Sequence, residues 1–181
     1  MATVTTQHDP GSRTVVIRAA VAADAEQIAA IYNFYVANTV ITFEEEPVSA
    51  QAMLARMNDV TGLGLPWLVC EVDGQLAGYS HATRWKARSA YRHSVETTIY
   101  LKQGFEGRGI GKQLYGALLP VLSSKGVHAV IGGAALPNAA SVALHESLGF
   151  EQVATFRQVG FKFGRWVDVA YWQLLLNTES T

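Results

Sequence analysis

Cysteine, charge and long hydrophobic runs are scarce in this chain of 181 residues. The single cysteine, Cys70, excludes an internal disulfide and a metal site built from several cysteines. A formal net charge of −1 gives no reason to expect a nucleic-acid or acidic-membrane partner. No run of about twenty apolar residues is present, and residues 1–12 lack the hydrophobic core of a signal peptide. We therefore expect a cytoplasmic protein that does not associate with membranes.

Apolar residues make up 49% of the sequence, which is enough for one compact α/β domain with its own core. We expect a flexible N-terminal tail over residues 1–12 and a single domain over residues 13–178. Apolar spacing of three and four residues predicts helices over 24–37, after Ser49, over 110–125 and from Asn138 or Ser141 to Gly149. Strand patterns cover 14–18, 67–72, 75–81, 95–101, 127–131, 151–156 and 167–176. Asp73-Gly74 predicts a tight hairpin turn, and 160–166 reads as a longer connection.

Residues 99–112 run from a strand-like stretch through a glycine cluster into an amphipathic helix. Glycines without a Cβ let consecutive backbone N–H groups turn toward an anion, and the helix adds the positive end of its dipole. Glu106 stands where a Walker A loop has glycine, and Lys112 stands where the dinucleotide fingerprint has glycine. The segment predicts a phosphate cradle of another class, or only a tight turn from strand to helix. The glycines concerned are Gly107, Gly109 and Gly111.

A strand, then Gln/Arg-x-x-Gly-x-Gly/Ala, then a helix resembles the acetyl-coenzyme A pyrophosphate motif of the GNAT superfamily of N-acetyltransferases. Gly109 and Gly111 match this motif, whereas Glu106 replaces the usual Gln or Arg at its first position. Further stretches, spread over nearly the whole chain, resemble the phosphinothricin and methionine sulfoximine acetyltransferases. They include Ile31-Tyr32-Asn33, Trp85-Lys86-Ala87-Arg88, Leu144-His145-Glu146 and Val159-Gly160-Phe161-Lys162.

The resemblance implies a single GNAT-type domain of the α/β (α+β) class. Its central sheet is mixed and mostly antiparallel, is splayed at the cofactor site, and is flanked by helices. The resemblance also implies acetyl-CoA as the cosubstrate and a homodimer. We expect no metal, because the five histidines show no spacing typical of metal ligands.

Acetyl transfer to an amine needs a base for the amine proton, a polarised thioester carbonyl and a proton for the departing thiolate. By resemblance, Glu96 takes the amine proton and His145 protonates the thiolate. From the sequence alone, an exposed strand acid and a buried core histidine also explain these two residues. The resemblance assigns cofactor binding to Ile99, Tyr100, Leu101, Gly107, Arg108, Gly109, Ile110, Gly111, Lys112 and Asn138. It assigns acceptor binding to Phe43, Lys86, Ala87, Arg88, Glu96, Thr97 and Thr98.

These observations predict an acetyl-CoA-dependent N-acetyltransferase that acts on the α-amino group of a small amino acid or analogue, such as phosphinothricin or methionine sulfoximine. Transfer is expected to be direct, within a ternary complex, because no base that would activate Cys70 is evident. Two alternatives stay open. One is the same fold acetylating another amine, such as a protein amino terminus or an aminoglycoside. The other is a non-enzymatic coenzyme A-binding regulatory module, which Glu106 makes conceivable.

Overall fold

The computed structural model describes residues 5–8 and 13–176, with the backbone alone for 5–8. Two compact units interleave along the chain. The first comprises Met1–Ile31, Val48–Ala82 and Ile99–Leu122, and the second comprises Tyr32–Pro47, Thr83–Thr98 and Ser123–Thr181.

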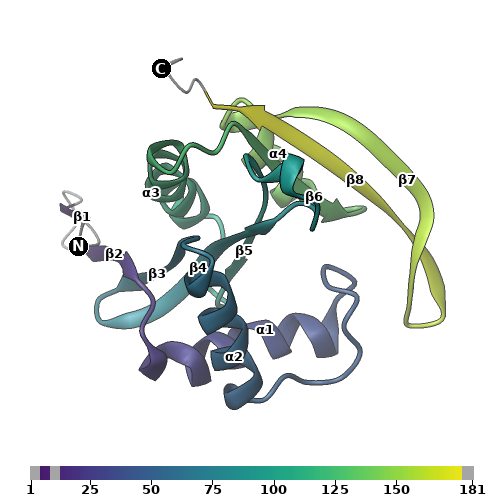
Figure 1. Cartoon of the computed structure of the whole chain (residues 1–181). Coiled ribbons are helices and arrows are strands. Elements are labelled where there is room, and N and C mark those ends of the chain that lie inside the picture. The colour runs from purple at the N-terminus through teal and green to yellow at the C-terminus, as the bar shows by residue number, and fades with distance from the viewer. Residues whose placement is uncertain (1–4, 9–12, 177–181) are drawn as a thin grey trace. The chain divides into compact units, whose positions relative to one another are not determined.

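The order of the elements follows the order that the sequence predicts, with one strand added at the start (Figure 1). The strands are β1 (Thr5–His8), β2 (Thr14–Ala19), β3 (Trp67–Val72), β4 (Gln75–Arg84), β5 (Ser94–Leu101), β6 (Ala129–Ala135), β7 (Glu151–Lys162) and β8 (Arg165–Leu175). The helices are α1 (Ala25–Asn38), α2 (Ala50–Gly62), α3 (Ile110–Ser124) and α4 (Ala139–Ser147), with short 3₁₀ turns at Ala22–Asp24 and Ser89–Tyr91. Among the described residues, no helix has the length and apolar character to cross a membrane.

In the first unit, β1, β2, β3 and β4 are neighbours in that order and run antiparallel. The predicted hairpin is confirmed: Asp73 and Gly74 both have positive φ, 51° and 78°, which suits the twist of a two-residue hairpin. Helix α2 packs on β3 and buries residues three and four apart, namely Met53, Met57 and Val60. Strand β1 lies within the expected N-terminal tail of residues 1–12. The rest of that tail, residues 1–4 and 9–12, lies outside the described ranges.

In the second unit, the strand order is β5-β6-β8-β7. β5 and β6 run parallel, from Ser94 opposite Ala129 to Thr97 opposite Gly132, and the pairs of β8 with β6 and β7 are antiparallel. This confirms a mixed, mostly antiparallel sheet. The parallel pairing covers four positions, although β5 itself continues to Leu101. Helix α4 packs on β6.

β7 and β8 form a long, curved hairpin (Figure 1). The connection predicted over 160–166 is wrong, because the strands stay paired up to Lys162 opposite Arg165. The turn consists of Phe163 and Gly164, both with positive φ, 51° and 71°. The physical reason for the error is an inverted pattern: Lys162 is buried, whereas Phe163 and its apolar neighbours in the hairpin are exposed.

Candidate active site

Glu96 and Thr97 are consecutive on β5, so their side chains project to opposite faces of the strand. The Thr97 side chain is buried, and its Oγ1 donates a hydrogen bond to the carbonyl of Ile131 at 3.3 Å. Its hydroxyl therefore contributes to the packing of β5 on β6. Glu96 and Thr98 are half-buried and share the other face.

The Glu96 carboxylate lies beside Gly133 of β6 and Tyr171 of β8. A Cβ on Gly133 would lie 3.3 Å from Glu96 Oε1 and 3.0 Å from Tyr171 Cε1, so the glycine leaves room for both groups. Burial raises the pKa of Glu96, and the positive charge of Lys86 partly opposes that rise. Burial also raises the pKa of Tyr171, and the charge of Glu96 raises it further. A carboxylate whose pKa is raised in this way is a better proton acceptor than an ordinary surface carboxylate.

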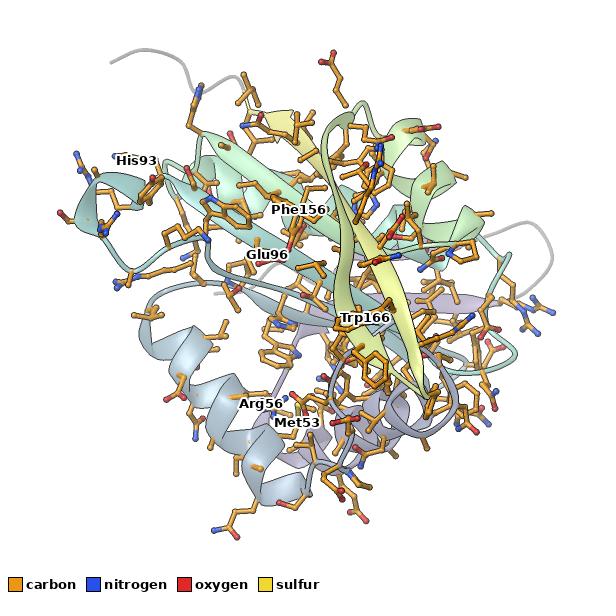
Figure 2. The ribbon with its side chains drawn as sticks, turned by 90° about the vertical axis from the view of Figure 1, so that its right-hand side faces the viewer. Met53, Arg56, His93, Glu96, Phe156 and Trp166 are labelled. Carbon is orange, nitrogen blue, oxygen red and sulfur yellow. The ribbon has the colours of Figure 1, made fainter. Side chains whose placement is uncertain are left out.

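Aromatic rings surround Tyr171 on this side of the second unit. The Trp85 ring lies 5.7 Å from the Tyr171 ring at an interplanar angle of 71°, and the Phe156 ring lies 5.8 Å away at 85°. Figure 2 shows Glu96 and Phe156 near the middle of the β7–β8 hairpin, with Trp166 nearer its turn. Aromatic faces attract cations, so this cluster beside a carboxylate is chemically suited to an ammonium group.

Three predicted acceptor residues, Lys86, Ala87 and Arg88, lie exposed in the segment between β4 and β5. The ammonium of Lys86 lies 4.6 Å from the centre of the Trp85 ring. Phe43 lies in the loop after α1, 38% exposed, with its ring seated against Gly160 of β7.

His145 lies on the inner face of α4 and is buried against β6 and β8. Its Nδ1 lies 2.8 Å from the carbonyl of Ser141, and a carbonyl only accepts, so Nδ1 carries the proton. The ring stacks on Trp172 at 5.7 Å. Burial lowers the pKa of His145, and the bond to Ser141 partly opposes this change. A neutral ring with Nδ1 protonated accepts a proton at Nε2, and donates one there only after it has bound a second proton.

Two adjacent glycines of β6 separate Glu96 from His145. A Cβ on Gly132 would overlap Nε2 of His145, whereas a Cβ on Gly133 would approach Glu96 and Tyr171. Since consecutive strand residues point to opposite faces, the two ionisable groups lie on opposite faces of β6 at the same point of the strand. The second unit therefore places both predicted catalytic residues against the same short stretch of β6, but with the backbone of that strand between their side chains.

Asn138 caps the N-terminus of α4: its Oδ1 accepts from the backbone N–H of Ser141 at 3.1 Å. It also lines an open cavity of about 750 Å³ between α4 and the start of β8. Glu96 and His145 do not line that cavity, so it is not where the candidate acid–base groups meet.

The glycine segment belongs to the first unit. Strand β5 ends at Leu101 and α3 begins at Ile110, as the sequence predicts. Gly107 and Gly109 have φ of 71° and 76°, and a Cβ at either position would meet nothing within 4 Å. Open space and left-handed backbone at these positions fit a cradle whose N–H groups approach an anion closely. Ile110 and Tyr100 are buried, so their side chains serve the core.

The charged side chains of the loop also bear on a phosphate site. Glu106 Oε2 accepts a hydrogen bond from the backbone N–H of Gly104 at 2.8 Å, so the acid at the unmatched motif position is held by its own loop. Arg108 lies 5.2 Å from the centre of the Phe105 ring, and both Arg108 and Lys112 are exposed. The residues of this loop therefore fit a diphosphate. The negative charge of Glu106 opposes such a ligand, but its carboxylate already accepts a hydrogen bond from the loop backbone.

A family model described as an acetyltransferase (GNAT) domain matches residues 17–171. The chain belongs to this family. Phosphinothricin N-acetyltransferase of Streptomyces viridochromogenes is 40% identical over 91% of this chain and 89% of that protein. L-methionine sulfoximine/L-methionine sulfone acetyltransferase of Salmonella typhimurium is 36% identical over 91% of this chain and 96% of that protein. A solved phosphinothricin acetyltransferase of Sinorhizobium meliloti in complex with AcCoA has a TM-score of 0.87 and 39% identity, covering 90% of this chain and 88% of that one.

These relatives confirm the predicted GNAT family, its fold class and the acetyltransferase class of enzyme. Sequence reasoning on this GNAT chain missed the residues that shape the space around the predicted groups. Gly132 and Gly133 are visible as a glycine pair in a strand, which signals close approach by a neighbour. Tyr171 has no such signal, because aromatic residues are ordinary in strands.

Proposed function

We propose that this GNAT enzyme transfers the acetyl group of acetyl-CoA to the α-amino group of a small amino acid or analogue of the phosphinothricin or methionine sulfoximine type. We further propose that transfer is direct, within a ternary complex. The relatives that carry these substrates in their names support the acceptor class. The burial of Cys70, the one thiol of the chain, supports direct transfer, because a buried thiol with a raised pKa is a poor carrier for an acetyl group.

The donor is held, in this proposal, by the glycine loop and the start of α3. Backbone N–H groups around Gly107 and Gly109, with Arg108 and Lys112, would hold the diphosphate. Asn138 would reach the pantetheine arm in addition to capping α4, and residues 99–101 of β5 would pair with that arm as a strand does. Acetyl-CoA supplies an activated acyl carbon and a thiolate leaving group.

In this proposal, each of the two ionisable groups takes part in one proton transfer of the reaction. An ammonium with a pKa of about 8 to 10 must lose a proton before its nitrogen attacks, and Glu96 accepts that proton directly or through water. The new C–N bond forms as the C–S bond breaks, and the thiolate takes up a proton. His145 supplies this proton when its ring is doubly protonated, and in its neutral form it accepts a hydrogen bond at Nε2.

Recognition of the acceptor divides between cations and aromatic rings. Lys86 and Arg88 carry the charges that suit a carboxylate and a phosphinate or sulfoximine group. Tyr171, next to Glu96, and Trp85, whose ring packs on Tyr171, suit the ammonium before it is deprotonated. This division predicts a preference for acceptors that carry an α-ammonium and an acidic group on one carbon.

A side-by-side assay of thiol release tests the proposal. Phosphinothricin, methionine sulfoximine and free amino acids are compared with an amino-terminal peptide and an aminoglycoside, each with acetyl-CoA. We expect turnover with at least one of the first group. Binding of acetyl-CoA without turnover on any amine would contradict an enzymatic role, and turnover confined to the peptide or aminoglycoside would contradict the acceptor class.

Replacement of Cys70 by Ala is expected to leave turnover near normal. The Cys70 side chain is fully buried, and burial raises the pKa of its thiol to about 11, so little thiolate exists at neutral pH. Turnover of the Cys70→Ala variant is measured by thiol release. Mass spectrometry of the wild type during catalysis is the complementary measurement, and an acetylated Cys70 found there would contradict direct transfer.

Replacement of Glu106 by Gln is expected to tighten acetyl-CoA binding by about two- to fivefold at low salt, as exposed charge pairs contribute little. The amide oxygen still accepts from the Gly104 N–H, while the negative charge beside the diphosphate is removed. Titration calorimetry at low and high salt measures the effect, which shrinks as salt screens the charge. Unchanged or weaker binding at low salt would show that Glu106 does not oppose the donor.

We also propose a cytoplasmic homodimer. Large apolar side chains of the hairpin are more than half exposed, namely Val153, Phe156, Val159, Phe161, Phe163 and Trp166. Such a concentration of exposed apolar residues is typical of an interface. Sedimentation equilibrium is expected to give twice the chain mass of 19.6 kDa, and a monomer at micromolar concentration would contradict the dimer.

The lone free thiol suits a reducing compartment, which fractionation of expressing cells can check.

A further inference from the structure

A lysine is buried where the β7–β8 hairpin meets the loop 39–47. Lys162 is 1% exposed, and its Nζ donates to the carbonyls of Val36 at 2.7 Å and Thr42 at 2.8 Å. The ring of Phe163 lies 5.0 Å from the same ammonium. Burying an ammonium costs free energy that two carbonyls and a ring offset only in part. A methionine of similar length would avoid this cost, so the lysine calls for a reason other than stability.

The two carbonyls lie at the two ends of one short segment. Val36 is in the last turn of α1, where backbone carbonyls have no partner within the helix and the helix dipole favours a cation. Thr42 is in the loop 39–47, and its hydroxyl also hydrogen-bonds the Tyr32 hydroxyl at 2.7 Å. One ammonium therefore ties the end of α1 and the loop that follows it to the same point of β7. The carboxylates of Glu44 and Glu45, in the same loop, add electrostatic attraction to this cation.

Gly160 lies two residues before Lys162 on β7, and a Cβ there would overlap the ring of Phe43. Gly160 is buried, and the ring of Phe43 occupies the space that a side chain would fill. Consecutive residues of the loop are thus held by the same strand, Thr42 through its carbonyl and Phe43 through its ring. The part of Phe43 that remains exposed, 38%, is available to a ligand.

We infer that Lys162 is a positioning residue for the acceptor pocket: by holding the loop 39–47 on β7, with Phe43 seated over Gly160, it fixes the wall that an amino acid acceptor meets. This inference rests on the proposed function, since it takes Phe43 as an acceptor contact. Lys162 itself touches neither substrate. Its replacement therefore acts on the acceptor and leaves the donor unaffected.

The test compares Lys162→Met with the wild type and with Lys125→Met, a matched change at an exposed lysine. With methionine sulfoximine as acceptor, Lys162→Met is expected to lower kcat/KM by about 10- to 100-fold, mainly through the acceptor KM, because a small misplacement of a binding wall has effects of this size. The dissociation constant of acetyl-CoA, from calorimetry, stays at the wild-type value. Hydrogen exchange of residues 37–44 becomes faster in Lys162→Met and not in Lys125→Met.

Each outcome decides for or against the inference. An unchanged acceptor KM in folded Lys162→Met overturns it, and so does an equal loss of donor and acceptor binding. If Lys162→Met does not fold, Gly160→Ala displaces the Phe43 ring without touching the buried ammonium, and the same rise in acceptor KM is required. If the wild type acetylates no amino acid, the proposed function fails, whereas hydrogen exchange still shows whether Lys162 holds the loop.

Discussion

Replacement of Glu96 by Gln is expected to lower kcat/KM for an amino acid acceptor by about 10²- to 10⁴-fold, the usual contribution of a positioned general base. The amide keeps the shape of the side chain beside Gly133 and Tyr171 but does not take up the amine proton. Steady-state kinetics measure the loss. Glu151→Gln, an identical change at an exposed position of β7, serves as the control and is expected to be silent.

The activity of the wild type is expected to depend on pH through the ionisation of Glu96. Burial raises the pKa of Glu96, so the base form is lost as pH falls through a value above the ordinary carboxyl range, and kcat/KM of the wild type falls with it. The Glu96→Gln variant has no such acidic limb. An unchanged pH profile in the variant would remove the base role from Glu96.

The raised pKa of Glu96 also affects the stability of the folded chain. A carboxyl whose pKa is higher in the folded than in the unfolded chain favours folding below its unfolded pKa, and this contribution is lost as pH rises through the folded pKa. At neutral pH the ionised Glu96 therefore weakens the fold, with the attraction of Lys86 as a partial offset. Glu96→Gln is expected to unfold at the same temperature as the wild type or higher, so its loss of activity is separable from unfolding. Unfolding at a clearly lower temperature would contradict this account.

Replacement of Gly132 by Ala is expected to destabilise the enzyme by about 1 to 3 kcal/mol, the typical cost of overpacking a core. The new Cβ would overlap Nε2 of His145 and lie 2.7 Å from its Cδ2, in a ring already packed on Trp172. The ring must move, so turnover falls as well. Urea denaturation and kcat are the two measurements.

Two further variants make the Gly132 result specific. In Gly132→Ala/His145→Ala the overlap is absent, so the two changes are expected to couple by about 0.5 to 3 kcal/mol, as contacting residues do. Gly116→Ala is the matched control: it adds the same methyl group in α3 where nothing lies within 4 Å, and is expected to stabilise the helix by about 1 kcal/mol. Additive effects of the two changes would show that Gly132 and His145 do not contact.

The elements with strong local signals were predictable from the sequence. The glycine segment is predictable as strand, loop and helix because a β-type stretch is followed by clustered glycines and then by apolar residues spaced three and four apart. The β3–β4 hairpin is predictable because Asp73-Gly74 tolerates the backbone that a two-residue turn requires. In both cases the information lies within a few consecutive residues.

The β7–β8 hairpin and the faces of the site were not predictable in the same way. Residues 160–166 do not show the pattern of a strand, because the hairpin turns a lysine inward and aromatic residues outward, which reverses the usual alternation. That Glu96 and His145 lie on opposite faces of β6 depends on the parallel register of β5 with β6 and on the packing of α4. These contacts join residues that are far apart in the sequence, and no pattern within a few consecutive residues predicts them.

The burial of the lone sulfhydryl has a practical benefit at the bench. A chromogenic disulfide reagent reacts with accessible sulfhydryls, and in the native enzyme Cys70 is shielded from it. The colour that develops during turnover therefore counts liberated coenzyme A alone, with no background from the catalyst. Adding denaturant afterwards exposes one equivalent per chain, which calibrates the enzyme concentration in the same cuvette.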